Sequence, residues 1–287
     1  MPYSMMQTSL PMYDLPEIRV MTQTWWQGIA KHMRLQDIED VPDFLIREVP
    51  LHTLWTERNL LLSQCCGFDV MNSYKDHLSV LMISNWDVAG CATGQYYSHI
   101  IVPEDSDFKH IGDLKNSTAA INGLESHSGM NALLSTVQPF VENGRFFKTI
   151  QVSGAHVESL RFVQDKLADV AAIDCVTYAL LKRYRPAILD KIRILSNTKP
   201  APALPYVTSI NTTLGTQQRM QAALKAAFQD PDLASVRKKL LLKEGIFPDL
   251  SSSSHPYFTR ENPYRKIAEG FTFDPQLLES MILREEY

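Results

Sequence analysis

The sequence predicts an α/β protein with two lobes, each built from a mostly parallel sheet flanked by helices. The chain has 287 residues, of which 45% are hydrophobic and 21% charged, and this length suits one large domain or two of ordinary size. Short apolar strand candidates alternate with helix-length segments through the middle of the chain. A mainly helical part follows, and packing it back on the N-terminal part gives a discontinuous lobe. We therefore expect residues 1–97 and 205–287 to form one lobe and residues 98–204 the other.

The N-terminal part opens with an extended segment, Thr8 to Met12, followed by a helix. Asp14 and Glu17 have the spacing of a capping box at the start of that helix. Apolar residues then recur at helical spacing, with Trp25 as core and Trp26 beside it: Ile18, Met21, Trp25, Ile29 and Met33. Four strand candidates come next: Phe44 to Arg47, Leu60 to Ser63, Val80 to Ile83 and Tyr96 to Val102.

The middle of the chain predicts a parallel sheet, because its strands alternate with helices. The expected strands are residues 118–121, 148–152, 170–173 and 192–195. The expected helices are residues 126–141, 155–167 and 174–184.

The last third predicts mostly helix. A proline-rich stretch from Lys199 to Pro205 connects to a strand candidate, Tyr206 to Ile210. The helices expected after it are residues 216–229, 233–243, 264–270 and 275–285. Asp232 and Asp274 are their candidate caps, and the serine run from Ser251 to Ser254 predicts a polar loop.

Composition excludes several classes of partner. The formal charge is 28 − 32 = −4, which gives no basic excess for a nucleic acid. No apolar run approaches the roughly 20 residues that span a bilayer, so no membrane span is expected. The first 14 residues lack the basic and apolar regions of a signal peptide. The cysteines (Cys65, Cys66, Cys91 and Cys175) lack zinc spacing, and we expect free thiols, no metal and no cofactor.

Three polar segments follow strands of the predicted parallel sheet, at the edge where such sheets bind ligands. Ser126, His127, Ser128 and Gly129 follow the first strand, and we expect the hydroxyls and the helix start there to face an anion. The alternative for Ser126 is a plain N-cap. His156 follows the second strand and can donate a hydrogen bond to an oxyanion. Asp174 follows the third; it can accept from a protonated ligand oxygen or act only as an N-cap.

Enzyme patterns are mostly missing from the sequence. It contains no P-loop, no GxGxxG and no HExxH, and Ser126 lacks the preceding glycine of a nucleophile elbow. Cys175 lies at a helix start, where a thiolate is stabilised, and is the candidate nucleophile if the protein is an enzyme. Heptads and repeats, which would favour a structural module, are not seen.

Several segments resemble the phosphate, phosphite and phosphonate-binding proteins of ABC importers, within the type 2 periplasmic binding protein fold. The most specific are AAINGLESHSGMNA (119–132) and VSGAHVESL (152–160), and the others are SLPMYD (9–14), LLSQCCG (61–67), YYSHIIV (96–102) and ADVAAIDCVTYAL (168–180). The resemblance implies two lobes joined by hinge strands near residues 97–102 and 203–209, with the ligand in the cleft.

The resemblance also implies roles for individual residues. Ser126, Ser128 and His156 match positions that hold the oxyanion, and Asp174 matches a position that accepts from a protonated ligand. Tyr13, Gln64 and Tyr97 are the contribution implied for the other lobe. His127, beside the serines, completes the candidate ligand-binding set.

The resulting hypothesis is a solute-binding protein that captures a phosphorus oxyanion for an ABC permease. The resemblance implies a periplasmic location, and the N-terminus leaves a cytoplasmic one as the alternative. Two other functions stay open: an enzyme of a cofactor-biosynthesis pathway on the same fold, or a binder of a sulfonate or pyrimidine-type ligand.

Overall fold

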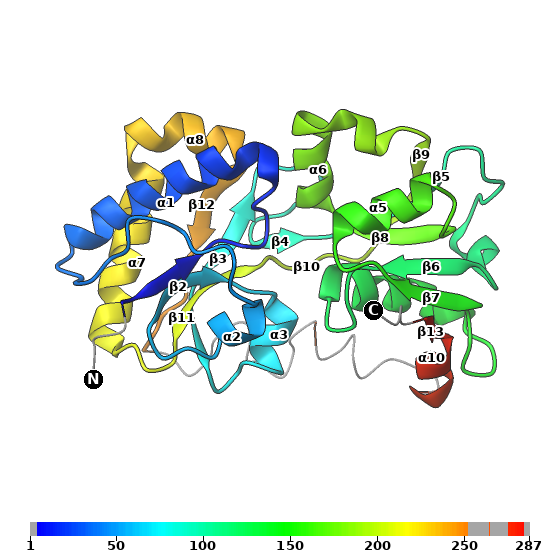
Figure 1. Ribbon diagram of the computed structural model, residues 1–287, viewed down its shortest axis with the longest axis horizontal. Helices are drawn as coiled ribbons and strands as arrows, with labels where there is room; N and C mark the ends of the chain where they lie inside the picture. Colours follow the sequence, from blue (N-terminus) through cyan, green and yellow to red (C-terminus); the bar gives the residue numbers. More distant parts are fainter. Residues whose placement is uncertain (1–4, 252–263, 265–274, 284–287) are drawn as a thin grey trace. The chain divides into compact units, whose positions relative to one another are not determined.

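A computed structural model describes residues 5–251, 264 and 275–283. The chain divides into two compact units: unit 1 is Met1–Gln95 with Pro202–Arg260, and unit 2 is Tyr96–Ala201 with Glu261–Tyr287. Two of the crossings from one unit to the other occur at short strands that pair with each other, β4 (Gln95–Tyr96) and β10 (Ala201–Pro202). Figure 1 shows the elements of both units.

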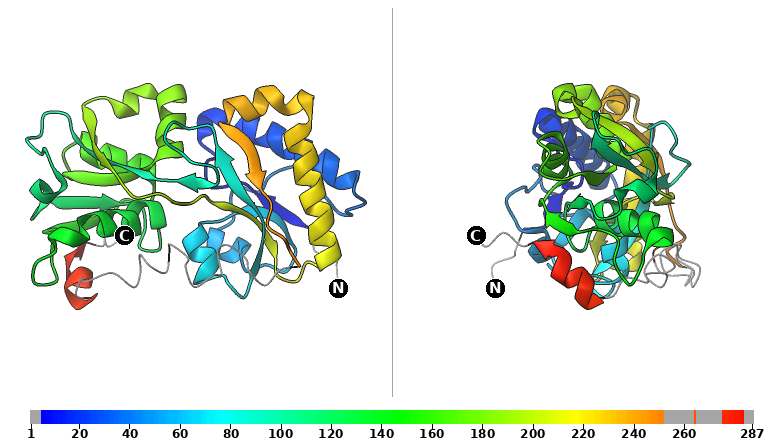
Figure 2. Two further views of the ribbon diagram at one scale, coloured as in Figure 1. Left: turned by 180° about the vertical axis from the view of Figure 1, so that it is seen from behind. Right: turned by 90° about the vertical axis from the view of Figure 1, so that its right-hand side faces the viewer.

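The C-terminal residues belong to a different unit from the one expected. We predicted residues 205–287 in the first lobe, but β13 (Ile282–Leu283) pairs in parallel with β7 (Thr149–Val152) of unit 2. Figures 1 and 2 show α10 (Pro275–Met281) and β13 beside β7. The physical reason is that β7 would otherwise leave its outer backbone groups unpaired at the edge of the sheet.

Unit 1 contains a five-stranded sheet of order β1-β2-β11-β3-β12. Its strands are β1 (Gln7–Ser9), β2 (Leu60–Gln64), β11 (Pro205–Ser209), β3 (Leu78–Trp86) and β12 (Leu242–Ile246). Only β1 and β2 pair in parallel; β11 runs antiparallel to β2 and β3, and β12 antiparallel to β3. The expectation of a mostly parallel sheet therefore applies to unit 2 rather than to unit 1.

The helices of unit 1 are α1 (Arg19–Arg34), α2 (Leu51–Leu54), α3 (Gly67–Met71), α7 (Leu214–Gln229) and α8 (Ala234–Lys239). Helix α1 packs against α7. Both Trp25 and Trp26 of α1 are buried. The helix expected over residues 233–243 ends at Lys239, because Leu241 adopts a left-handed φ of 58° and the chain continues as β12.

Two N-terminal predictions were wrong. Asp14 does not cap the helix; it forms an ion pair with Arg47, and a 3-10 helix (Pro16–Ile18) without a side-chain cap leads into α1. The segment from Phe44 to Arg47 is not a strand, although the Ile46 N–H donates to the Thr8 carbonyl oxygen at 2.8 Å. Single hydrogen bonds to other elements hold this segment instead of a strand ladder, and the Ser9 Oγ also donates to the Ile46 carbonyl oxygen at 2.7 Å.

Unit 2 contains a six-stranded sheet of order β13-β7-β6-β8-β5-β9. The strands not yet given are β6 (Thr118–Ile121), β8 (Val170–Asp174), β5 (Ser98–Pro103) and β9 (Ile192–Asn197). The pairs from β13 to β8 are parallel, and β5 is antiparallel to both β8 and β9. The strand expected over Tyr96–Val102 is interrupted at Tyr97, between β4 and β5.

The helix predicted over residues 126–141 is irregular. It starts as a π-helical turn (His127–Asn131), continues as α4 (Ala132–Val137) and ends as a 3-10 turn (Gln138–Phe140) that contains a proline. The π-helical turn arises because the N–H groups of both Met130 and Asn131 donate to the Ser126 carbonyl oxygen. Such turns often occur at functional sites.

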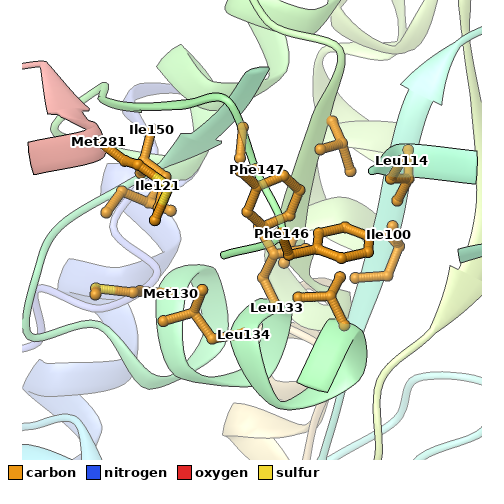
Figure 3. Packing of buried hydrophobic residues seen from close by; sticks show 14 of the residues in the cluster. Ile100, Leu114, Ile121, Met130, Leu133, Leu134, Phe146, Phe147, Ile150 and Met281 are labelled. Carbon is orange, nitrogen blue, oxygen red and sulfur yellow. The ribbon is translucent and has the colours of Figure 1, made fainter. Parts of the chain in front are cut away.

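The core of unit 2 lies between α4 and one face of the sheet. Figure 3 shows Leu133 and Leu134 of α4 packed with Ile121, Ile150 and Phe147. Alternate residues of each strand face the other side of the sheet, which α5 (His156–Gln164) and α6 (Cys175–Tyr184) cover (Figure 1). Both helices therefore start at the edge of the sheet where β7 and β8 end.

Within the part of the chain that the structure describes, no helix is long and apolar enough to cross a membrane.

Candidate functional site

The end of strand β6 leads into a tight turn that presents two serine hydroxyls. The Ser126 Oγ accepts a hydrogen bond from the Gly129 N–H at 3.1 Å, so Ser126 is an N-cap as the plain alternative expected. Its side chain is half-buried and keeps a hydroxyl proton to donate. The N–H groups of His127 and Ser128 lie at the helix start, where no acceptor within the helix is available. This turn can therefore donate to an anion from both side chains and backbone.

Gly129 is required at this turn because no side chain fits there. A Cβ atom at position 129 would lie 1.8 Å from the Oδ1 atom of Asn122, so the carboxamide of Asn122 occupies the space beside the glycine. The Asn122 Oδ1 atom is buried and has no hydrogen-bond partner within the described part of the chain. This contact could not be predicted from the sequence, because it joins two ends of a loop whose path depends on the tertiary structure.

The second strand end brings a histidine to the same turn. His156 is the first residue of α5, and its Nε2 atom lies 2.8 Å from the Ser128 Oγ in a hydrogen bond. Burial lowers the pKa of His156 to about 4, an effect that the nearby Ala172 carbonyl partly offsets. The ring is therefore neutral at physiological pH, and its hydrogen bonds to a ligand are those of a neutral imidazole.

Two further serines, which sequence reasoning missed, fix this arrangement. The Ser153 Oγ donates to the Ile121 carbonyl oxygen at 3.0 Å and lies 2.6 Å from the Ser159 Oγ, tying the end of β6 to the start of α5. The Ser98 Oγ donates to the Ser128 carbonyl oxygen at 2.9 Å. Ser153 and Ser98 each connect strand ends that are distant in sequence. These contacts become visible only once the pairing of the strands is known.

Asp174 ends the third strand and caps helix α6. One of its carboxylate oxygens accepts from the N–H groups of Val176 at 2.7 Å and Thr177 at 2.9 Å. Its neighbour across the sheet is Ser98, the residue that holds the Ser128 carbonyl. The structure thus places Asp174 at the same edge as the serines and His156, but buries it, with 2% of its surface exposed.

His127 lies in the interior rather than beside the hydroxyls at the surface. It is 2% exposed, and its ring meets the rings of Tyr264 (4.6 Å between centroids) and Tyr96 (6.2 Å). Burial lowers its pKa to about 3. Its role in the turn is therefore packing.

The burial of His127 predicts a pH-dependent stability. Unfolding restores the ordinary His pKa of about 6.5, so below that pH the unfolded chain binds a proton at His127 and the folded chain does not. The contribution of the buried neutral ring to the stability of the folded state is fully present above pH 6.5 and is lost as the pH falls toward 3. Between pH 7 and pH 5 we expect a loss on the order of 2 kcal/mol in the free energy of unfolding from this residue. Urea unfolding at both pH values should show a smaller loss in His127→Phe; an equal loss would contradict the assignment.

Of the other three predicted residues, one belongs to unit 2 and two belong to unit 1. Tyr97, in unit 2, has its ring edge-on to His99 at 5.2 Å, and its carbonyl oxygen accepts from the Cys175 N–H. Tyr13 and Gln64 belong to unit 1 and are buried there. Tyr13 packs edge-on to Trp86 at 4.6 Å.

Gln64 forms a side-chain hydrogen bond with the hydroxyl of Tyr206, whose pKa burial raises to about 12. The Trp25 Nε1–H donates to the same hydroxyl at 3.1 Å. Gln64 is therefore part of a buried polar network in unit 1.

The cysteines are free thiols, as predicted. Cys65 and Cys175 are buried, and burial raises the pKa of Cys65 well above its usual value. A buried thiol with a raised pKa is a poor nucleophile. Among the described residues, no group of histidine, cysteine and acidic side chains has the arrangement of a metal site.

A family of known proteins matches the larger part of the chain. The matching family is described as the periplasmic substrate-binding protein of ABC phosphonate transporters, and the match covers residues 50–246. No curated protein sequence matches the chain.

Solved structures share the fold at low sequence identity. XAC2383 from Xanthomonas citri, solved bound to ATP, is 15% identical with a TM-score of 0.65, over 97% of this chain and 99% of that one. A binding protein component of an ABC phosphonate transporter from Pseudomonas aeruginosa is 16% identical with a TM-score of 0.67, over 85% of this chain and 81% of that one. PhnD1 from Prochlorococcus marinus, in complex with methylphosphonate, is 12% identical with a TM-score of 0.67, over 93% of this chain and 97% of that one. These similarities confirm the predicted type 2 binding-protein fold.

Proposed function

Because the chain belongs to the family of periplasmic substrate-binding proteins of ABC phosphonate transporters, we propose that it captures a small phosphorus oxyanion and delivers it to an ABC permease. The family consists of solute-binding proteins, which argues against the enzyme alternative. Phosphate, phosphite and alkylphosphonates are the candidate ligands. A periplasmic location follows from the same proposal.

One observation carries the choice of ligand class. The hydrogen bond between the Ser128 Oγ and the His156 Nε2 joins two strand ends and brings a hydroxyl and an imidazole to one edge of the sheet. When the imidazole donates to the Ser128 Oγ, the Ser128 hydroxyl proton is left to donate to a ligand. With Ser126 and the backbone N–H groups of the turn, these donors suit the several oxygens of a tetrahedral anion. No lysine or arginine belongs to this set, so the anion is held by hydrogen bonds and helix-start dipoles instead of by an opposite charge.

Asp174 supplies the proposed selectivity. A carboxylate at the same edge repels a fully ionised oxygen and accepts from a protonated one. The N-cap bonds to Val176 and Thr177 hold the carboxylate in place. We therefore propose that the protein prefers a ligand that keeps one O–H group, as a phosphate or phosphonate monoanion does.

The ligand is best identified by thermal unfolding against a panel of anions. The panel consists of phosphate, phosphite, methylphosphonate, aminoethylphosphonate, sulfate, a sulfonate and ATP, which the Xanthomonas relative binds. We expect one phosphorus oxyanion to raise the melting temperature, since a ligand that binds only the folded state stabilises it. A shift with the sulfonate alone, or with no member of the panel, would overturn the proposed ligand class.

A further inference from the structure

The C-terminal part of the chain reaches the turn that carries the two serines. Tyr264 is 1% exposed, and its ring stands edge-on to the ring of His127, with 4.6 Å between centroids and 88° between planes. His127 lies between Ser126 and Ser128 in sequence and is the first residue of the π-helical turn. The packing of Tyr264 therefore acts directly on the residue between the two hydroxyls.

Packing is the main constraint on His127. Its Nδ1 atom is buried without a hydrogen-bond partner in the described part of the chain. The ring is held by aromatic neighbours, Tyr264 at 4.6 Å and the more distant Tyr96 at 6.2 Å. A ring fixed by edge-to-face contacts loses its orientation when the nearer partner is removed.

The same C-terminal part is anchored on the strand that leads to His156. Ile282 pairs with Ile150 of β7, and Met281 is 2% exposed within the core of unit 2. Figure 3 shows Met281 next to Ile150 and Ile121, which lie on the two strands whose ends carry the candidate donors. The family match ends at residue 246, so this support lies outside the matched region.

From these contacts we propose that Tyr264 is a positioning residue of the anion site, which keeps Ser126 and Ser128 in their binding geometry by holding His127. The inference rests on the proposed function for its binding consequence, but the ordering of the turn can be measured without ligand. Tyr264 then supports the site from a position far along the chain from the serine turn.

The test compares Tyr264→Ala with Tyr264→Phe, which keeps the ring. A matched control is Tyr74→Ala in unit 1, because Tyr74 also packs edge-on to a buried ring, that of Trp55 at 5.1 Å. Hydrogen exchange of the amides of residues 127–131 is measured without ligand. Calorimetry then gives the Kd for methylphosphonate and for inorganic phosphate.

We expect Tyr264→Ala to accelerate exchange at residues 127–131 and to weaken binding by about 3- to 10-fold, the range of an aromatic pair. Tyr264→Phe keeps the ring contact with His127 and should change both readouts less than Tyr264→Ala does. Tyr74→Ala should leave both readouts unchanged. Unchanged exchange in Tyr264→Ala, or equal acceleration in the control, would overturn the inference. If Tyr264→Ala does not fold, Tyr264→Leu keeps apolar volume without the ring edge. If the wild type binds neither probe, the proposed ligand is wrong, while the exchange result still decides the positioning role.

Discussion

Changing both Ser126 and Ser128 to alanine should abolish binding of the phosphorus oxyanion while leaving the fold intact. Each hydroxyl that donates to a charged ligand contributes on the order of 1.5–3 kcal/mol, so the double change should weaken binding by roughly 10²- to 10⁴-fold. Calorimetry with the ligand identified from the panel measures the loss, and circular dichroism checks the fold.

The single variants separate two roles that the sequence left open. Ser126→Ala also removes the hydrogen bond to the Gly129 N–H, which should cost about 1 kcal/mol of stability. Ser128→Ala removes only the partner of His156 and should weaken binding with a smaller effect on stability. Ser235→Ala, at an exposed position of α8, is the control and should change neither. Undiminished affinity in the double variant would remove the serine turn from the site.

Gly129→Ala should damage both stability and binding. The new Cβ would lie 1.8 Å from the Asn122 Oδ1, so either the carboxamide or the turn must move. Overpacking of this kind typically costs about 1–3 kcal/mol, and the displaced turn no longer presents the Ser126 and Ser128 hydroxyls together. Denaturant unfolding and calorimetry measure the two effects.

A double-mutant cycle tests whether the contact with Asn122 causes the loss of stability in Gly129→Ala. Asn122→Ala removes the obstructing carboxamide, so the Asn122→Ala/Gly129→Ala pair should recover most of the stability lost in Gly129→Ala. Gly215→Ala is the matched control, because no atom lies within 4 Å of the Cβ that it adds in α7. Gly215→Ala should be neutral or slightly stabilising, since alanine favours helix. If Gly129→Ala were as harmless as Gly215→Ala, the packing argument would be wrong.

The sequence predicted best where structure is decided locally. Strand β6 lies at the predicted residues, and Asp174 caps α6, which was one of the two roles predicted for it, because apolar runs and caps act within a few residues. Strands β12 and β13 were missed because their pairing partners, β3 and β7, are far away in the chain. The expected cap at Asp14 failed for a similar reason, since Arg47 competes for the carboxylate.

The candidate site was predictable in part. Ligands bind where the strands of a parallel sheet end, and this rule predicted Ser126, Ser128, His156 and Asp174 as site residues. The structure places all of them at one sheet edge. Their supporting residues, Ser98 and Asn122, could not be found, because each acts through a tertiary contact. A histidine between two serines suggests an exposed loop, and the burial of His127 depends on Tyr264. The helix expected over residues 264–270 and the cap at Asp274 fall outside the described residues, apart from Tyr264 itself.

The pairing of β13 with β7 has a consequence for biosynthesis. A ribosome makes Thr149–Val152 long before Ile282–Leu283, so the outer edge of β7 stays without its final neighbour until residues 282–283 have emerged. Strand β12 imposes the same delay on the other sheet, because it pairs with β3 from residue 242 onward. Neither sheet can be completed early during translation. During translation, the edge of β3 therefore stays exposed until residue 242 has been made, and the edge of β7 until residue 282 has been made.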